Sequence, residues 1–284
     1  MPVLLWVLLI TFISGVGGTG LGGVISACIR KDSKKIVSLL LSFAGGVMLS
    51  VVCFDLVSNA LFPAETRTAE HLPLVLAGIA FGFSLVALLN FWIDRNTNHE
   101  VTHVNQESHP KTADDLDELI HSDHYSEHKK EQSSLFTAGL IMAAAIALHN
   151  LPEGMVIGAA YAGTNSNAIF TGGGILIAAV IGLHNVPEGM AVAVPLIAGG
   201  TKRSHAIWIT ALSGLPTVVG ALIGYLLGSL GPIWNALALS FASGAMLYVV
   251  FGELLPESIL MWRSKLPALA VIVGMLCGMV IIFA

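Results

Sequence analysis

Long apolar stretches, separated by shorter polar segments, recur along the whole chain. Eight of them approach or exceed the roughly 20 residues that an α-helix needs to cross a bilayer. Numbered as spans one to eight, they cover approximately residues 3–29, 36–62, 73–93, 134–162, 169–199, 205–230, 233–258 and 266–284. Strands of membrane β-barrels are shorter and alternate in polarity. The pattern therefore predicts an all-α integral membrane protein with eight transmembrane helices, forming a single transmembrane domain.

The composition agrees with a membrane location. Charged residues make up 11% of the 284 residues and hydrophobic residues 55%, whereas a soluble domain carries about 25% charged residues. The first span starts directly after Met1-Pro2, without a basic segment or a small-residue cleavage site. We therefore expect a retained span, not a signal peptide.

The basic residues indicate the orientation of the chain in the membrane. All but Arg67 follow odd-numbered spans: Arg30, Lys31, Lys34, Lys35, Arg95, Lys111, Lys129, Lys130, Lys202, Arg203, Arg263 and Lys265. The positive-inside rule places these loops in the cytoplasm. The prediction is a multi-pass protein of the cell membrane with both termini extracellular. The partners expected are the lipid bilayer and small ions, not nucleic acid.

One polar hexapeptide occurs twice inside apolar surroundings. The sequence His-Asn-Leu-Pro-Glu-Gly at residues 149–154 recurs as His-Asn-Val-Pro-Glu-Gly at residues 184–189. A charged side chain at the centre of a bilayer costs roughly 2.5–3.5 kcal/mol on insertion scales. A sequence that contains this motif twice, in spans four and five, is expected to use it.

The spacing inside each motif brings a nitrogen and an oxygen donor together. His149 and Glu153 are four residues apart, as are His184 and Glu188, so each pair shares one helical face. If the two helices are antiparallel neighbours, the four side chains converge. Imidazole and carboxylate without thiolate suit a first-row transition ion such as Zn²⁺. The alternative reading is a buried polar network that only joins helices.

A second internal similarity predicts an inverted repeat. Residues 42–49 of span two reappear 198 positions later as residues 240–247 of span seven. Ser14-Gly15 of span one similarly matches Ser213-Gly214 of span six. Spans one to three and six to eight are therefore expected to be related, with opposite orientation, around a central pair of spans four and five. Inverted repeats with polar groups at mid-membrane are typical of secondary transporters.

Three further carboxylates suggest an entrance and an exit. Asp55 lies towards the outer end of span two, and the same lag of 198 residues leads to Glu253 towards the inner end of span seven. We expect Asp55 to collect a cation and Glu253, helped by Glu257 one turn later, to receive it inside. The alternative is that these carboxylates are simply solvated at the membrane surface.

The segment from about 94 to 133 has the most polar composition and contains six histidines. It predicts a flexible cytoplasmic loop. His121, His124 and His128 have helical spacing and could bind metal weakly, and a loop without this role is the alternative.

With these motifs in place, the whole chain resembles the ZIP (Zrt/Irt-like protein) family of metal-ion transporters. The resemblance implies uptake of Zn²⁺, with Fe²⁺, Mn²⁺, Co²⁺ or Cd²⁺ as competitors, and often a homodimer. By motif position it implies metal contacts at His149, Asn150, Glu153, His184, Asn185 and Glu188, with Met48 as a further contact. Some relatives carry a carboxylate in span six where this chain has Thr217, which puts a second bound ion in doubt.

The function expected is zinc uptake by alternating access through a site at mid-membrane. The same transporter working as an exporter is not excluded by the residues. An intramembrane zinc-dependent hydrolase is the alternative from another class, since buried zinc beside a glutamate can activate water. Many such enzymes carry a His-Glu-x-x-His motif on a helix at the zinc site. The one occurrence in this chain, residues 99–103, lies in the polar segment and not in a span. We therefore expect a transporter and not an enzyme.

Overall fold

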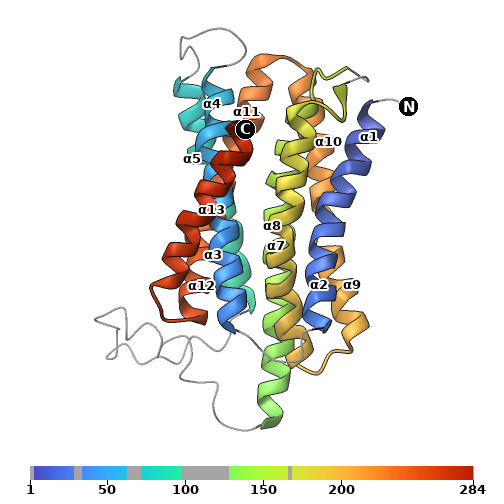
Figure 1. Cartoon of the computed structure of the whole chain (residues 1–284), viewed down its shortest axis with the longest axis vertical. Helices are drawn as coiled ribbons and strands as arrows, with labels where there is room; N and C mark the ends of the chain where they lie inside the picture. Colours follow the sequence, from blue (N-terminus) through green and yellow to red (C-terminus); the bar gives the residue numbers. More distant parts are fainter. Residues whose placement is uncertain (1–2, 29–33, 63–71, 98–127, 166–167, 284) are drawn as a thin grey trace.

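The computed structural model describes residues 3–28, 34–62, 72–97, 128–165 and 168–283. These residues include eight helical segments that are long and apolar enough to cross a membrane, which confirms the eight predicted spans (Figure 1). The elements are α1 (Val3–Phe12), η1 (Ile13–Gly17), α2 (Gly18–Cys28), α3 (Lys34–Ser50), η2 (Val51–Leu56), α4 (Val57–Leu61), α5 (Leu72–Thr97), α7 (His128–Tyr161), α8 (Gly173–Ala198), α9 (Arg203–Ser213), α10 (Pro216–Ser229), α11 (Pro232–Tyr248), η5 (Val249–Leu254), α12 (Leu255–Met261) and α13 (Leu266–Phe283).

Four spans are not uniform α-helices. Spans one, two and seven contain the π-helical segments η1, η2 and η5, which the apolar pattern did not reveal. Span six, expected as one helix, is two helices, α9 and α10, with a turn at Gly214 and Leu215. Pro216 begins α10, and its missing N–H explains why the helix breaks there. Helix also extends into the predicted loop, because α5 continues to Thr97 and α7 starts at His128.

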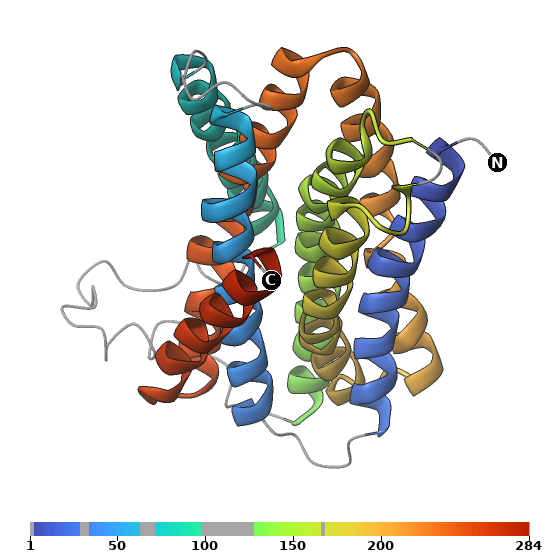
Figure 2. The same ribbon diagram turned by 45° about the horizontal axis from the view of Figure 1, so that its top comes forward.

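The eight spans of the described residues pack as two groups (Figure 2). We call α1–α2, α7, α8 and α9–α10 the motif group, because it contains both hexapeptides. The other spans, α3–α4, α5, α11–α12 and α13, form the flanking group. Within the motif group α2 packs on α8 and α10 on α7, and within the flanking group α3 packs on α13 and α5 on α11. In the predicted inverted repeat, the pairing of α2 with α8 corresponds to that of α10 with α7, and the pairing of α3 with α13 corresponds to that of α11 with α5. The packing is therefore consistent with the repeat, which itself stays a prediction.

Glycines allow the backbones inside each group to approach closely. A Cβ on Gly154 would meet the carbonyl of Thr217 in α10, and one on Gly22 would meet the carbonyl of Val186 in α8. In the flanking group, Gly46 approaches Val271 and Gly244 approaches Ile79 in the same way. Small residues at such crossings let membrane helices associate through van der Waals contact.

The outer faces of the bundle remain apolar. The third and eighth spans are each only 17% buried, and they expose large side chains such as Phe81, Phe91, Trp92 and Val280. Exposed apolar surface of this extent suits contact with lipid tails.

Candidate metal centre

Three buried side chains from the two motif helices meet at the centre of the bundle. Glu153 of α7 and His184 and Glu188 of α8 each offer a donor atom, and these atoms lie within 4.8 Å of one another. Runs rich in Ala, Leu and Ile precede both motifs and favour helix. Both helices continue through Pro152 and Pro187, so the side chains keep their helical spacing. We call Glu153, His184 and Glu188 the central triad.

The triad contains more negative charge than its protein partners neutralise. His184 Nε2 lies 3.0 Å from Glu153 Oε1. Among the described residues, neither carboxylate oxygen of Glu188 has a hydrogen-bond partner, although the residue is fully buried. Burying an unpaired carboxylate is costly unless a cation compensates it. One imidazole and two carboxylates suit Zn²⁺, which takes nitrogen and oxygen ligands in tetrahedral sites.

His149, the fourth side chain expected at this point, is not part of the triad and contacts a different carboxylate. His149 Nε2 lies 2.9 Å from Glu253 Oε2 of η5, and it stays within electrostatic range of Glu188 and Glu153. Glu253, expected further along an exit path, therefore reaches the edge of the centre itself. Glu257 is half-buried one turn further on, in α12.

The two motif asparagines connect the spans around the triad. Asn150 Nδ2 donates to the carbonyls of Ile146 and Ser213, each over 3.0 Å. The hydroxyl of Thr217 lies 3.1 Å from Asn150 Oδ1. Asn185 satisfies both polar atoms of its amide when its nitrogen faces Glu153 Oε2, 3.0 Å away. In this arrangement the asparagines hold α7, α8 and span six together.

Thr217 and Ser213 were not expected in this network. The sequence signal that could have located them is the helix break Ser-Gly-Leu-Pro at residues 213–216, which puts backbone carbonyls and a hydroxyl at mid-span. Thr217 is fully buried. It offers a neutral oxygen where a carboxylate would be needed to help hold a second cation.

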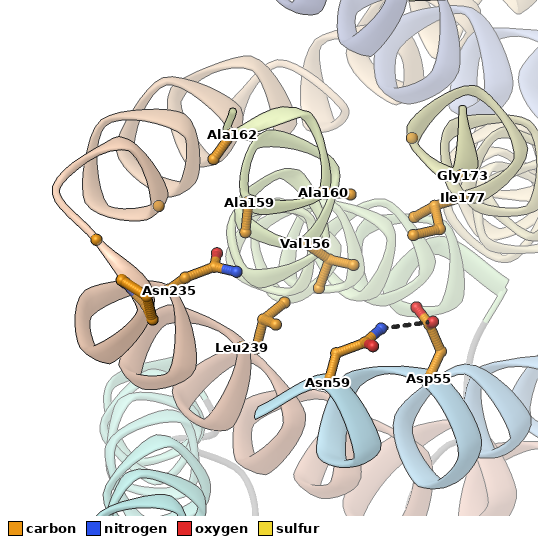
Figure 3. Close-up of a pocket in the computed structure, with 14 residues that line it drawn as sticks. Asp55, Asn59, Val156, Ala159, Ala160, Ala162, Gly173, Ile177, Asn235 and Leu239 are labelled. Carbon is orange, nitrogen blue, oxygen red and sulfur yellow. Dashed lines mark hydrogen bonds between the residues drawn. The ribbon is translucent and has the colours of Figure 1, made fainter. Parts of the chain in front are cut away.

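A cavity of about 450 Å³ lies at the end of the bundle where α4 ends and α8 begins. Asp55 of η2 lines it, and Asn59 of α4 donates to Asp55 Oδ1 over 2.9 Å. Figure 3 shows these side chains facing Val156 of α7 and Ile177 of α8. Val156 follows Glu153 by three residues, so the cavity reaches to within about one helical turn of the triad.

The remaining predicted residues have other positions. Met48 is fully buried in the hydrophobic core, and its contact with a metal stays a prediction. His121 and His124 lie outside the described residues. His128 is the first residue of α7, and its role in metal binding also stays a prediction.

Comparison with known proteins agrees with this architecture. The profile of the ZIP zinc transporter family matches residues 2–284. A zinc transporter ZupT of Akkermansia muciniphila is 31% identical over 96% of this chain and 95% of the relative. ZupT of Clostridium perfringens is 30% identical over 99% of this chain and 95% of the relative, and ZupT of Chlorobium limicola is 35% identical over 88% and 87%. With its eight spans and full-length match, this chain belongs to the ZIP family of zinc transporters.

Proposed function

We propose that the chain imports Zn²⁺ into the cytoplasm through the central triad by alternating access. Family membership makes it a multi-pass membrane transporter of zinc and not an enzyme. The observation that carries the finer proposal is Glu188, a fully buried carboxylate without a hydrogen-bond partner among the described residues, beside a second carboxylate and an imidazole. A divalent cation is the species that this arrangement accommodates best.

The distribution of basic residues supports an extracellular position for the cavity end. Lys35, Arg203 and Lys265 lie near the ends of spans two, six and eight that are opposite the cavity. Positive charge marks the cytoplasmic side of membrane proteins. We therefore assign the cavity at Asp55 to the extracellular side, with both termini, and the contact between His149 and Glu253 to the cytoplasmic half.

The order of the polar groups then describes a path. A hydrated ion enters the cavity and is attracted by the carboxylate of Asp55. It exchanges water for the donors of Glu153, His184 and Glu188, and next meets His149 and Glu253. Glu257 extends the path towards the cytoplasm. One ion at a time is expected, because the buried neighbour of the site in span six is the neutral Thr217.

The division into two groups of helices supports alternating access. The triad belongs entirely to the motif group, whereas Asp55 and Glu253 belong to the flanking group. Close glycine contacts join the helices within each group. We therefore propose that one group moves against the other as a unit and exposes the triad first to one carboxylate and then to the other.

Zinc flux into proteoliposomes tests the proposal. His184→Ala and Glu188→Gln are expected to abolish flux, whereas His205→Ala, an exposed histidine in α9, serves as a matched control that keeps it. Unchanged flux in Glu188→Gln would show that the triad is not the transport site. Vesicles with uniformly oriented protein separate import from export, and competition by Fe²⁺, Mn²⁺, Co²⁺ or Cd²⁺ measures selectivity.

A further inference from the structure

The two acids of the flanking group lie at equivalent places in two unusual helical segments. Asp55 is the fifth residue of η2 (Val51–Leu56), and Glu253 is the fifth residue of η5 (Val249–Leu254). The segments are of equal length and are separated by the same 198 residues as the sequence similarity of spans two and seven. π-Helical turns are rare and occur frequently at functional sites.

A π-helical turn changes where the following side chains point. Each hydrogen bond spans five residues instead of four, so one extra residue is fitted into the turn. Side chains beyond it are rotated relative to those of a continuous α-helix. In η5 this rotation brings Glu253 to His149 at 2.9 Å, on the face towards the motif group.

η2 and η5 each start directly after a residue that is anchored to the neighbouring peripheral helix. Ser50 precedes η2, and its hydroxyl donates to the carbonyl of Met275 in α13 over 2.5 Å. Tyr248 precedes η5, and its hydroxyl accepts a hydrogen bond from Asn90 Nδ2 of α5 over 3.1 Å. Ser50 and Tyr248 are themselves 198 residues apart, so the same arrangement occurs twice.

The anchor at Tyr248 reaches the residue next to Glu253. The ring of Tyr248 packs edge-on against Phe83 of α5, with ring centroids 5.4 Å apart. A Cβ added to Gly252 would meet this ring at 3.0 Å. The ring therefore lies directly beside the backbone of Gly252, where a Cβ would force it to shift by a few tenths of an ångström.

We propose that Tyr248, held by Asn90, is a positioning residue that keeps η5 in the register that points Glu253 at His149. Ser50 has the equivalent role for Asp55 in η2. The inference deepens the proposed function and rests on it for its transport consequences. The geometric part, the alignment of Glu253 with His149, is independent of transport.

A cross-linking experiment tests the geometric part. The background carries Cys28→Ser, Cys53→Ser and Cys277→Ser, since all three cysteines are free and exposed. His149→Cys and Glu253→Cys are then bridged by a short bifunctional methanethiosulfonate. Tyr248→Phe and Gly252→Ala are each expected to slow bridging roughly threefold or more, the scale of one hydrogen bond between membrane helices.

Tyr161→Phe is the matched control, because it also removes a phenol hydrogen bond, to the carbonyl of Ile169 over 3.2 Å. It is expected to leave the bridging rate unchanged. Equal bridging rates in Tyr248→Phe and the background would overturn the positioning role, as would equal slowing in Tyr161→Phe.

Zinc uptake separates this inference from the proposed function. Tyr248→Phe is expected to lower the maximal uptake rate at an unchanged KM, and to have no further effect when Glu253→Gln is already present. If bridging slows but uptake is unaffected, Glu253 is positioned by Tyr248 but does not take part in transport. If uptake falls equally with and without Glu253→Gln, Tyr248 acts elsewhere and the positioning role is wrong.

Discussion

The imidazole of His149 and the carboxylate of Glu253 are in contact at 2.9 Å, across the boundary between the motif group and the flanking group. His149 belongs to the group that contains the triad, and the side chain of Glu253 is 16% exposed. In the proposed path, this partly accessible carboxylate accepts the ion from the buried centre and passes it on to water.

Glu253→Gln is expected to lower maximal zinc uptake by about 10–100-fold, the scale of losses when a group that orients a metal ligand is replaced. The amide can still hydrogen-bond to His149, so folding should be largely retained. Uptake kinetics together with thermal unfolding measure both effects. Uptake at the original rate would remove Glu253 from the path.

Glu188→Gln should have opposite effects on function and stability. Zinc binding at the triad is lost because a neutral amide replaces a charged ligand. The free energy of unfolding of the zinc-free protein should rise by about 1–3 kcal/mol, since an unpaired buried charge disappears. Metal content of purified protein and unfolding in a chelator provide the two measurements. Retained stoichiometric zinc would contradict the proposed ligand role.

Asp55→Asn is expected to raise the apparent KM for zinc uptake and to change the maximal rate little. The carboxylate lies at the cavity and not in the triad, so its loss weakens attraction of the ion but leaves the central ligands intact. Raising the ionic strength should reduce uptake by the original protein more than uptake by the variant. Identical kinetics of the two proteins would exclude an entrance role.

Mildly acidic pH is expected to weaken zinc binding. The carboxylates of Glu153 and Glu188 and the imidazole of His184 must be deprotonated to act as ligands, so protons compete with the ion and binding releases protons. Stability of the zinc complex is therefore greatest at neutral pH and declines as pH falls. Zinc titrations at several pH values, with proton release measured in two buffers, check this. Binding that does not change with pH would argue against these ligands.

Gly154→Ala tests the packing of α7 against α10. The new Cβ would overlap the backbone carbonyl of Thr217, which cannot move as a flexible side chain can. The free energy of unfolding should fall by about 1–3 kcal/mol, the usual effect of overpacking. Gly173→Ala is the matched control for stability, because a Cβ there meets nothing within 4 Å. Equal stability of both variants would show that this helix crossing tolerates a wider spacing.

The spans and the core of the centre could be predicted because each depends on local sequence. Apolar length alone gives the eight helices. The four-residue spacing puts His184 and Glu188 on one face, and adjacency of spans four and five brings Glu153 to them. None of these steps requires knowledge of how distant spans are rotated.

The partner of His149 could not be predicted, because it depends on such a rotation. The residues of η5 could equally form a regular α-helix, and the sequence does not distinguish the two conformations. The two conformations point Glu253 in different directions. The contact of Thr217 with Asn150 similarly needs the exact depth of span six relative to span four. The internal similarity predicted that Asp55 and Glu253 correspond, but it did not predict that Glu253 is the one of these two acids that contacts a motif histidine.

Close glycine crossings link helices within each group of four, and among the described residues every glycine approach to another helix's backbone falls inside one group. Mutations at these crossings should therefore alter how long the protein survives heat or detergent. Mutations along the boundary where His149 and Glu253 meet should instead alter turnover. Resistance to unfolding and the transport rate then depend on separate sets of positions. Selection or engineering can therefore change one of them and leave the other nearly unchanged.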